Sequence, residues 1–143
     1  MEEDEFDRWA RELEQQMQRE IENTYSSTVI REWLNPSNMG RMRDADAHAR
    51  YTGPCGDTME LFLKIEGNTV TGASFLTDGC GATIACGSML TKMISGEPVE
   101  RVRGVTDAHL LEKLGGLPEE NEHCATLAVN TLHLALKEWK KKT

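Results

Sequence analysis

The sequence predicts an α+β fold: a small, three-stranded antiparallel sheet covered by helices, with an extra N-terminal helix. Two observations support this prediction. Apolar and polar residues alternate over residues 59–77 around a turn at Gly67 and Asn68, which is typical of a β-hairpin. Residues 122–141 carry a wide apolar face, which suits a helix lying on a sheet. A third strand is expected within residues 46–54.

Residues 5–24 are predicted to form a single amphipathic helix, because apolar residues recur at steps of three and four. These residues are Phe6, Trp9, Leu13, Met17 and Ile21. Most of the net charge of −8 lies in residues 1–24, with nine acids against three arginines. The apolar stripe needs a cover, either in its own domain or on a second chain. We therefore divide the chain into an acidic helical extension, residues 1–24, and a body, residues 25–143.

The body is expected to hold further helices around the sheet. In chain order, the pattern predicts a short helix capped by Ser26 or Ser27, a loop at residues 35–40, the hairpin, a helix over about residues 82–95, a short helix over about residues 106–115, and a final helix over about residues 122–141. Gly96 and Pro98 end the helix predicted over about residues 82–95.

Charge and hydropathy exclude two classes of partner. No apolar run approaches the roughly 20 residues that span a membrane. The one basic cluster, at Lys137 and residues 140–142, ends a predicted helix, where it complements the helix dipole, so nucleic acid is not expected. The first residues, Met-Glu-Glu-Asp-Glu, lack the features of a signal or transit peptide, so a cytoplasmic location is expected.

The chain has four cysteines: Cys55, Cys80, Cys86 and Cys124. In a reducing cytoplasm they are expected to be free thiols, which favours metal binding or thiol chemistry over disulfides. Simple filling of the core stays open as an alternative, because free cysteines are often buried. The absence of a C-x-x-C pair argues against a zinc finger.

Three of the cysteines share a local setting. Cys55 lies in a Gly/Pro turn, Cys80 lies between two glycines where a strand gives way to a helix, and Cys124 lies in the first turn of the last helix. Helix starts favour the thiolate, which is the form that attacks sulfur and binds metals. Asp57 follows Cys55 by two residues, so on an extended segment both face the same way. A turn role for Asp57 and a surface or capping role for His123 are the alternatives.

Four motifs stand in the body of the chain. They are Tyr-Ser at residues 25–26 with Asn-Pro-Ser-Asn-Met-Gly at residues 35–40, Pro-Cys-Gly-Asp at residues 54–57, Asp-Gly-Cys-Gly-Ala-Thr-Ile-Ala at residues 78–85, and His-Cys at residues 123–124. In order and spacing they resemble the IscU/NifU-type iron–sulfur cluster assembly scaffolds, over about residues 25–141. The resemblance implies a three-stranded antiparallel sheet covered on one side by helices.

The resemblance also implies a function. A cysteine desulfurase would pass persulfide sulfur to the protein, iron and electrons from a donor such as a ferredoxin would join it, and a transient [2Fe-2S] cluster would form. The cluster would then move to apo iron–sulfur proteins, so the protein would be a carrier and not an enzyme. By position, Cys55, Cys80 and Cys124 would be the thiolate ligands, and Cys124 the persulfide acceptor. Asp57 would be the non-thiolate ligand, and His123 an auxiliary or alternative one.

The chain departs from this family at several places. Cys86 stands where many relatives have a small hydroxyl residue; we favour core packing for it, with a sulfur-relay role as the alternative. Leu-Pro-Glu-Glu-Asn at residues 117–121 replaces the Leu-Pro-Pro-Val-Lys segment that a dedicated chaperone reads, so chaperone recognition is not expected. The N-terminal helix is additional, and we hypothesise that it supports a homodimer. Because the sequence stops soon after the last helix, we expect the chain to act alone, without the further domains of full-length NifU proteins.

A zinc-binding persulfide acceptor of the same fold is the main competing interpretation, because three cysteines and an aspartate also suit tetrahedral zinc. Relatives of that type tend to carry an insertion before the last helix and to lack a histidine beside the final cysteine. This chain has His123 and no evident insertion. We therefore expect iron–sulfur assembly, with zinc as a possible substitute in the same site. A purely structural adaptor would leave the glycine-flanked cysteines unexplained.

Overall fold

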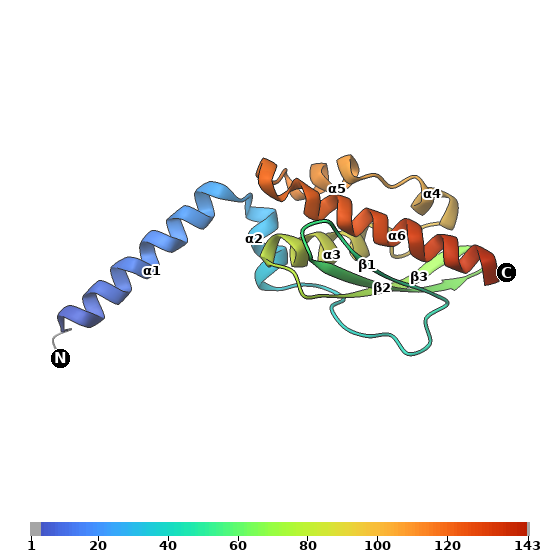
Figure 1. Cartoon of the computed structure of the whole chain (residues 1–143), viewed down its shortest axis with the longest axis horizontal. Coiled ribbons are helices and arrows are strands. Elements are labelled where there is room, and N and C mark those ends of the chain that lie inside the picture. Colours follow the sequence, from blue (N-terminus) through green and yellow to red (C-terminus); the bar gives the residue numbers. More distant parts are fainter. Residues whose placement is uncertain (1–3, 143) are drawn as a thin grey trace.

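A three-stranded antiparallel sheet in the order β1-β2-β3 forms the base of the fold, and helices cover one of its faces (Figure 1). The computed structural model describes residues 4–142. The strands are β1 (Ala47–Thr52), β2 (Thr58–Glu66) and β3 (Thr69–Thr77). The helices are α1 (Glu5–Thr24), α2 (Ser27–Leu34), α3 (Gly81–Ile94), α4 (Val99–Arg103), α5 (Asp107–Leu114) and α6 (Glu122–Lys142), with a 3-10 turn η1 (Glu119–Asn121). The predicted α+β fold is confirmed.

The hairpin of β2 and β3 forms as predicted, with one irregularity. Gly67 and Asn68 both have positive φ values, 55° and 63°, as a tight two-residue hairpin turn requires. The pairing then shifts between Lys64 and Ile65: Ile65 pairs with Val70 but Lys64 pairs with Gly72, which leaves a bulge in β3. The bulge explains why Val70 and Ala73, three residues apart, both face the core.

Helix α3 packs closely between β3 and α2. A Cβ atom on Gly87 would overlap the ring of Phe75 in β3, and one on Gly81 would overlap the ring of Trp33 in α2. Glycine is therefore required at both positions for the helix to come this near. The start of α3, with Cys80 at its N-cap, is thereby held against the end of the sheet and against α2.

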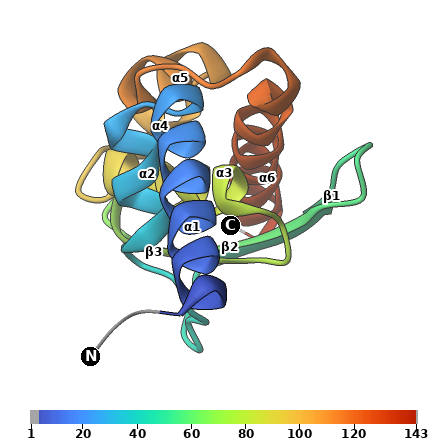
Figure 2. The same ribbon diagram turned by 90° about the vertical axis from the view of Figure 1, so that its left-hand side faces the viewer.

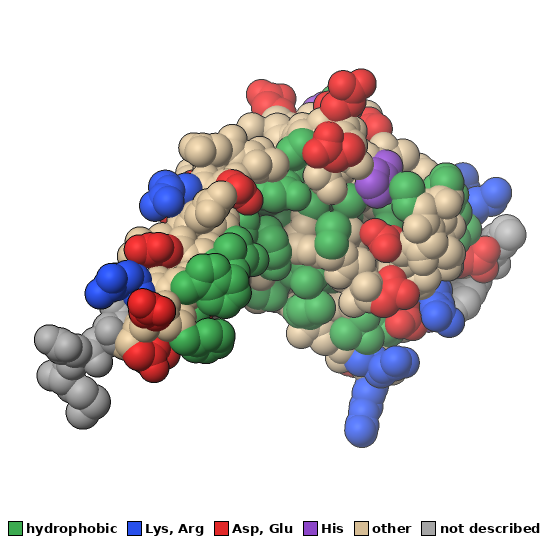
Figure 3. Space-filling view, turned by 60° about the vertical axis from the view of Figure 1, so that its left-hand side comes forward, with side chains coloured by type: hydrophobic (Ala, Val, Ile, Leu, Met, Phe, Trp, Pro, Cys, Tyr) green, Lys and Arg blue, Asp and Glu red, His purple; other side chains and the backbone are tan. Residues whose placement is uncertain are grey.

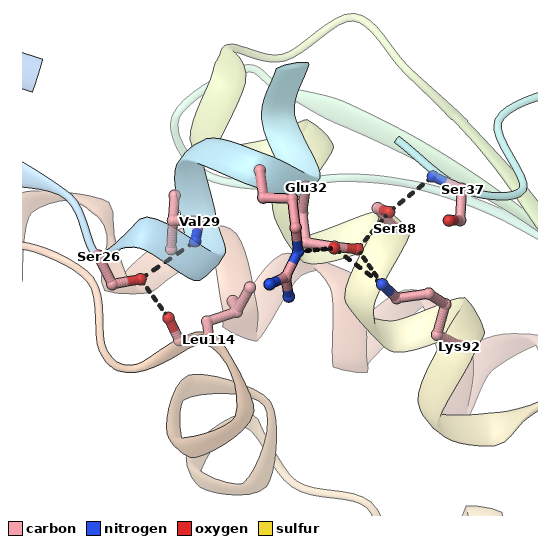
Figure 4. A network of polar contacts seen from close by, with 8 residues as sticks. Ser26, Val29, Glu32, Ser37, Ser88, Lys92 and Leu114 are labelled. Carbon is pink, nitrogen blue, oxygen red and sulfur yellow. Dashed lines mark hydrogen bonds and ion pairs between the residues drawn. The ribbon is translucent and has the colours of Figure 1, made fainter. Parts of the chain in front are cut away.

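An ion pair between the buried Glu32 and the exposed Lys92 ties α2 to α3 (Figure 4). The Glu32 carboxylate is 2% exposed; one of its oxygens lies 2.7 Å from Lys92 Nζ and accepts a hydrogen bond of 2.8 Å from Ser88 Oγ. Ser88 Oγ also accepts a bond from the Ser37 backbone N–H. Burial alone would raise the pKa of Glu32, but the bonds from Lys92, Ser88 and Arg31 outweigh it, so the pKa lies below its ordinary value of 4.5.

Helix α1 projects away from the body (Figures 1 and 2). None of its residues is buried, and Phe6, Trp9 and Met17 are 69%, 57% and 53% exposed. Figure 3 shows hydrophobic side chains gathered along one side of the projecting helix. The stripe predicted for this segment therefore lies uncovered by its own domain. None of the helices within residues 4–142 has the length and apolar character needed to cross a membrane.

The Lys92→Met substitution should lower the free energy of unfolding by about 1–2 kcal/mol, because it leaves a buried carboxylate without its main counter-charge, while the exposure of Lys92 to solvent weakens the pair. The double variant Glu32→Met/Lys92→Met should lose less, because both charges are gone. Urea denaturation of the metal-free proteins at pH 7 measures both losses. An equal loss in the single and double variants would contradict this account.

The same ion pair has a predictable pH dependence. Because the pKa of Glu32 is lower in the folded than in the unfolded protein, its contribution is complete above pH 4.5 and disappears as the pH falls through the folded value. The stability difference between the parent and Lys92→Met should therefore shrink in acid.

Candidate metal centre

Three segments bring the predicted ligands together at one end of the sheet. The turn between β1 and β2 carries Cys55 and Asp57, the start of α3 carries Cys80, and the start of α6 carries His123 and Cys124. Among the residues that the structure describes, the ligand atoms of Asp57, His123 and Cys124 all lie within 4.8 Å of one another. A carboxylate, an imidazole and a thiol thus converge from two segments 66 residues apart in the sequence.

Cys124 forms the floor of the site and is 0% exposed. Its Sγ lies 3.7 Å from His123 Nε2 and accepts a hydrogen bond of 3.3 Å from Thr83 Oγ1. Burial raises the pKa of this thiol to about 11; the bond from Thr83 opposes the shift, while the nearby Cys80 and Asp57 add to it. In the metal-free protein Cys124 is therefore a protonated thiol at neutral pH.

Cys80 is the N-cap residue of α3 and is exposed. Partial burial works against its ionisation, but the backbone N–H groups of Thr83 and Ala82 and the Thr83 hydroxyl outweigh that effect and lower its pKa. The expectation that helix starts favour thiolates is thus correct for Cys80. It is wrong for Cys124, where the desolvation of a fully buried sulfur is the larger effect.

Cys55 lies apart from this group in an exposed turn, which projects beyond the sheet in Figure 2. The turn is closed by a bond of 2.9 Å from the Gly53 N–H to the Asp57 carbonyl and contains Gly56 at a φ of 90°. Because the segment is a turn and not extended chain, the two-residue spacing does not bring Cys55 and Asp57 into one cluster. Neither Cys55 nor Cys80 joins the three mutually close ligand residues.

Sequence reasoning missed two residues that border the site. Thr83 Oγ1 lies 3.4 Å from Asp57 Oδ2 in addition to its bond with Cys124, and it follows Cys80 by one helical turn, which is the signal that could have found it. The Tyr25 hydroxyl lies 3.4 Å from Asn121 Oδ1. Burial raises the pKa of Tyr25, and the neighbouring charges of Cys80, Glu120 and Cys124 raise it further.

Cys86 lies in the hydrophobic core with a fully buried side chain. Burial raises the pKa of its thiol far above the usual range, with smaller contributions from Cys124 and Cys80. A thiol in this setting is not ionised at neutral pH and packs as a small apolar side chain. Its placement favours core packing over a sulfur-relay role.

The fold and the side chains gathered at one end of the sheet define a small α+β protein with a candidate metal site of mixed donors. Thiolates are ligands for iron–sulfur clusters and for zinc, while a carboxylate is a harder ligand that binds such centres less strongly. The model of the NifU-like N terminal domain matches residues 24–143, and the chain belongs to this family.

Several relatives carry descriptive names. The chain is 38% identical over 121 residues to the "Iron-sulfur cluster assembly scaffold protein IscU" of Aquifex aeolicus, covering 82% of this chain and 77% of the relative. It is 32% identical over 123 residues to the protein of the same name from Haemophilus influenzae, covering 82% and 97%. A NifU-like protein (N-terminal) from Brucella abortus shares the fold, with a TM-score of 0.69 at 18% identity, over 86% of this chain and 99% of the other.

Alkylation should distinguish the thiols of the metal-free protein. Cys124 is 0% exposed and burial raises its pKa to about 11, so at pH 8 iodoacetamide should modify the exposed Cys80 well before Cys124. Peptide mass spectrometry over time measures each rate, and buried Cys86 is the internal control that should react after unfolding. Equal rates at Cys80 and Cys124 at pH 8 would contradict the assignment.

Proposed function

We propose that this protein is a scaffold on which a transient [2Fe-2S] cluster is assembled and from which it passes to apo iron–sulfur proteins. The convergence of Asp57, His123 and Cys124 within 4.8 Å, beside the exposed thiol of Cys80, carries the proposal. Family membership and the names of the relatives support it. Iron and the cluster are cargo in this scheme, and the protein acts as a carrier and not as an enzyme.

Sulfur enters as persulfide from a cysteine desulfurase, with Cys124 as the acceptor. The Cys124 thiol gives up its proton to water, and the resulting thiolate attacks the outer sulfur of the desulfurase persulfide; the sulfur–sulfur bond in that persulfide breaks, and the desulfurase thiolate leaves. The step exchanges one thiolate for another and consumes no electrons. The hydrogen bond from Thr83 to the Cys124 sulfur stabilises the attacking thiolate.

Electrons are needed to complete the cluster. Each sulfane sulfur must take up two electrons to become sulfide, while each iron(II) gives up one on oxidation to iron(III). A [2Fe-2S] cluster with both irons oxidised therefore needs two further electrons, which we assign to an external donor such as a ferredoxin.

Cys55, Cys80 and Cys124 are the proposed thiolate ligands, Asp57 the oxygen ligand, and His123 an auxiliary or alternative one. We propose the cytoplasm as the location, because all four cysteines must stay reduced.

Asp57 is the most weakly bound ligand of the proposed cluster. Clusters that stay in place are usually held by four thiolates, and a carboxylate is a harder, weaker ligand for such an iron. The iron bound by Asp57 is then the first to be released. Three thiols and a carboxylate also suit tetrahedral zinc, so a zinc-binding persulfide acceptor is the second candidate function.

Anaerobic reconstitution with iron(II), cysteine and a cysteine desulfurase tests the proposal. The parent protein should develop the absorption of a [2Fe-2S] cluster, with about two irons per cluster by metal analysis. A colourless protein that retains stoichiometric zinc and does not take up iron and sulfide would favour the zinc alternative.

The Asp57→Ala variant should hold its cluster longer against a chelator, because the weak ligand is gone. Equal stripping rates in variant and parent would contradict the role of Asp57.

We further propose that the protein is a homodimer in which α1 of one copy covers apolar surface of the other. Exposed Phe6, Trp9 and Met17 supply an apolar stripe that its own domain leaves uncovered. The acidic excess of α1 opposes pairing of two α1 helices with each other. A depression lined by Arg103, His133, Leu136, Lys137 and Lys140 carries charge opposite to that of α1. In the proposed dimer, α1 of one copy therefore packs against the body of the second copy.

Light scattering should report a dimer for the full chain and a monomer after deletion of residues 1–22. Trp9→Glu, on the stripe, should also give a monomer, because it places a charge in the apolar contact. Gln15→Glu introduces the same side chain on the opposite face of α1 and should leave the dimer intact. An unchanged molar mass after the deletion would overturn the role of α1.

A further inference from the structure

The Thr83 hydroxyl lies at the centre of the site and is 0% exposed. Its oxygen is 3.3 Å from Cys124 Sγ, 3.4 Å from Asp57 Oδ2 and 3.8 Å from Cys80 Sγ. It therefore contacts one residue from each of the three segments that build the site. None of these contacts follows from the family motifs, in which the cysteines and the aspartate are the functional residues.

The packing around Thr83 fixes its side chain in this position. A Cβ atom on Gly79 would lie 2.7 Å from both the Cβ and the Oγ1 of Thr83, so the threonine side chain fills the space that this glycine leaves open. The Gly79 backbone thus limits where the Thr83 side chain can lie.

Other helical threonines of the chain behave differently. Thr24, Thr91 and Thr131 each donate their hydroxyl hydrogen to a backbone carbonyl of the preceding turn, as threonine commonly does in helices. Thr83 instead directs its hydroxyl at three groups of the site. A hydroxyl has a single hydrogen, so it can donate to one of these acceptors at a time.

We propose that Thr83 is a positioning residue. Its hydroxyl group fixes the position of Cys124 relative to Asp57 for metal binding, and it donates a hydrogen bond to the Cys124 sulfur. The alignment of two ligands from separate segments does not depend on which metal is bound. The effect on a bound cluster rests on the proposed scaffold function. There, a hydrogen bond to a ligand sulfur stabilises added negative charge and raises the reduction potential.

Cobalt(II) alone is the probe for the positioning of Cys124 and Asp57, because its thiolate charge-transfer band reports sulfur coordination without any cluster chemistry. Thr83→Val keeps the shape and removes the hydroxyl, and it should weaken cobalt(II) binding about 10- to 100-fold, as loss of a residue that orients a ligand typically does. Thr83→Ser keeps the hydroxyl and should restore both affinity and spectrum. Thr91→Val is the matched control: another buried threonine of α3, whose hydroxyl bonds the Ser88 carbonyl and the Asn38 side chain and not the candidate ligands, so its loss should leave cobalt(II) binding unchanged.

Urea denaturation of each metal-free variant shows that the proteins compared are folded. Parental affinity and spectrum in Thr83→Val would overturn the proposal. Equal losses in Thr83→Val and Thr83→Ser would also overturn it, because side-chain shape and not the hydroxyl would then be responsible.

The reconstituted cluster supplies the second readout. Thr83→Val should shift its reduction potential to a more negative value, and Thr83→Ser should return it toward the parent. Failure of the parent to form any cluster, with cobalt(II) binding still dependent on the hydroxyl, would refute the scaffold function and leave Thr83 as a positioning residue. A normal cluster in all variants, with unchanged potential and unchanged cobalt(II) binding, would refute the role of Thr83 alone.

Discussion

The close packing of α3 between β3 and α2 is the constraint on which the site depends. Gly87 meets Phe75 on one side of the helix and Gly81 meets Trp33 on the other, and neither place has room for a Cβ atom. Because the helix is held from both sides, its first turn has a defined position at the end of the sheet. That turn presents Cys80 to solvent. The other two segments of the site then only have to reach this fixed point.

The parts of the fold that could be predicted are those encoded by nearby residues. The turn at Gly67 and Asn68, the amphipathic stripe of α1 and the cap of α2 each depend on a few neighbouring side chains. The bulge in β3 could not be predicted, because it comes from the pairing of two strands and from the bond between Val70 and the chain near Glu97. Helix α4 was missed because its five residues are too short for a periodic pattern.

The predictions for the site residues also held where nearby residues decide the outcome and failed where distant segments decide it. Glycine neighbours and helix starts identified Cys55, Cys80 and Cys124 as unusual, and for Cys80 the local argument about ionisation holds. For Cys124 it fails, since burial beneath other segments decides its pKa and no local pattern records that burial. The central place of Thr83 was hidden for a related reason. A threonine in a helix is unremarkable until the fold brings Asp57 and Cys124 to its hydroxyl.

Burial increases across the site from the exposed Cys55 to the enclosed Cys124. If Cys124 accepts sulfur, its sulfur atom must be reached, so one of the surrounding segments has to open. The start of α3 is held by glycine packing, whereas residues 54–56 of the turn are exposed, and the turn meets the site through the Asp57 side chain, 3.4 Å from Thr83 Oγ1. Opening this turn would leave the core intact, as expected of a surface loop. Asp57, the hardest of the proposed ligands, lies on the same turn. The same motion would therefore admit sulfur to Cys124 and withdraw the ligand that binds the cluster least strongly, so sulfur entry and cluster release would both depend on this turn, beside the fixed start of α3.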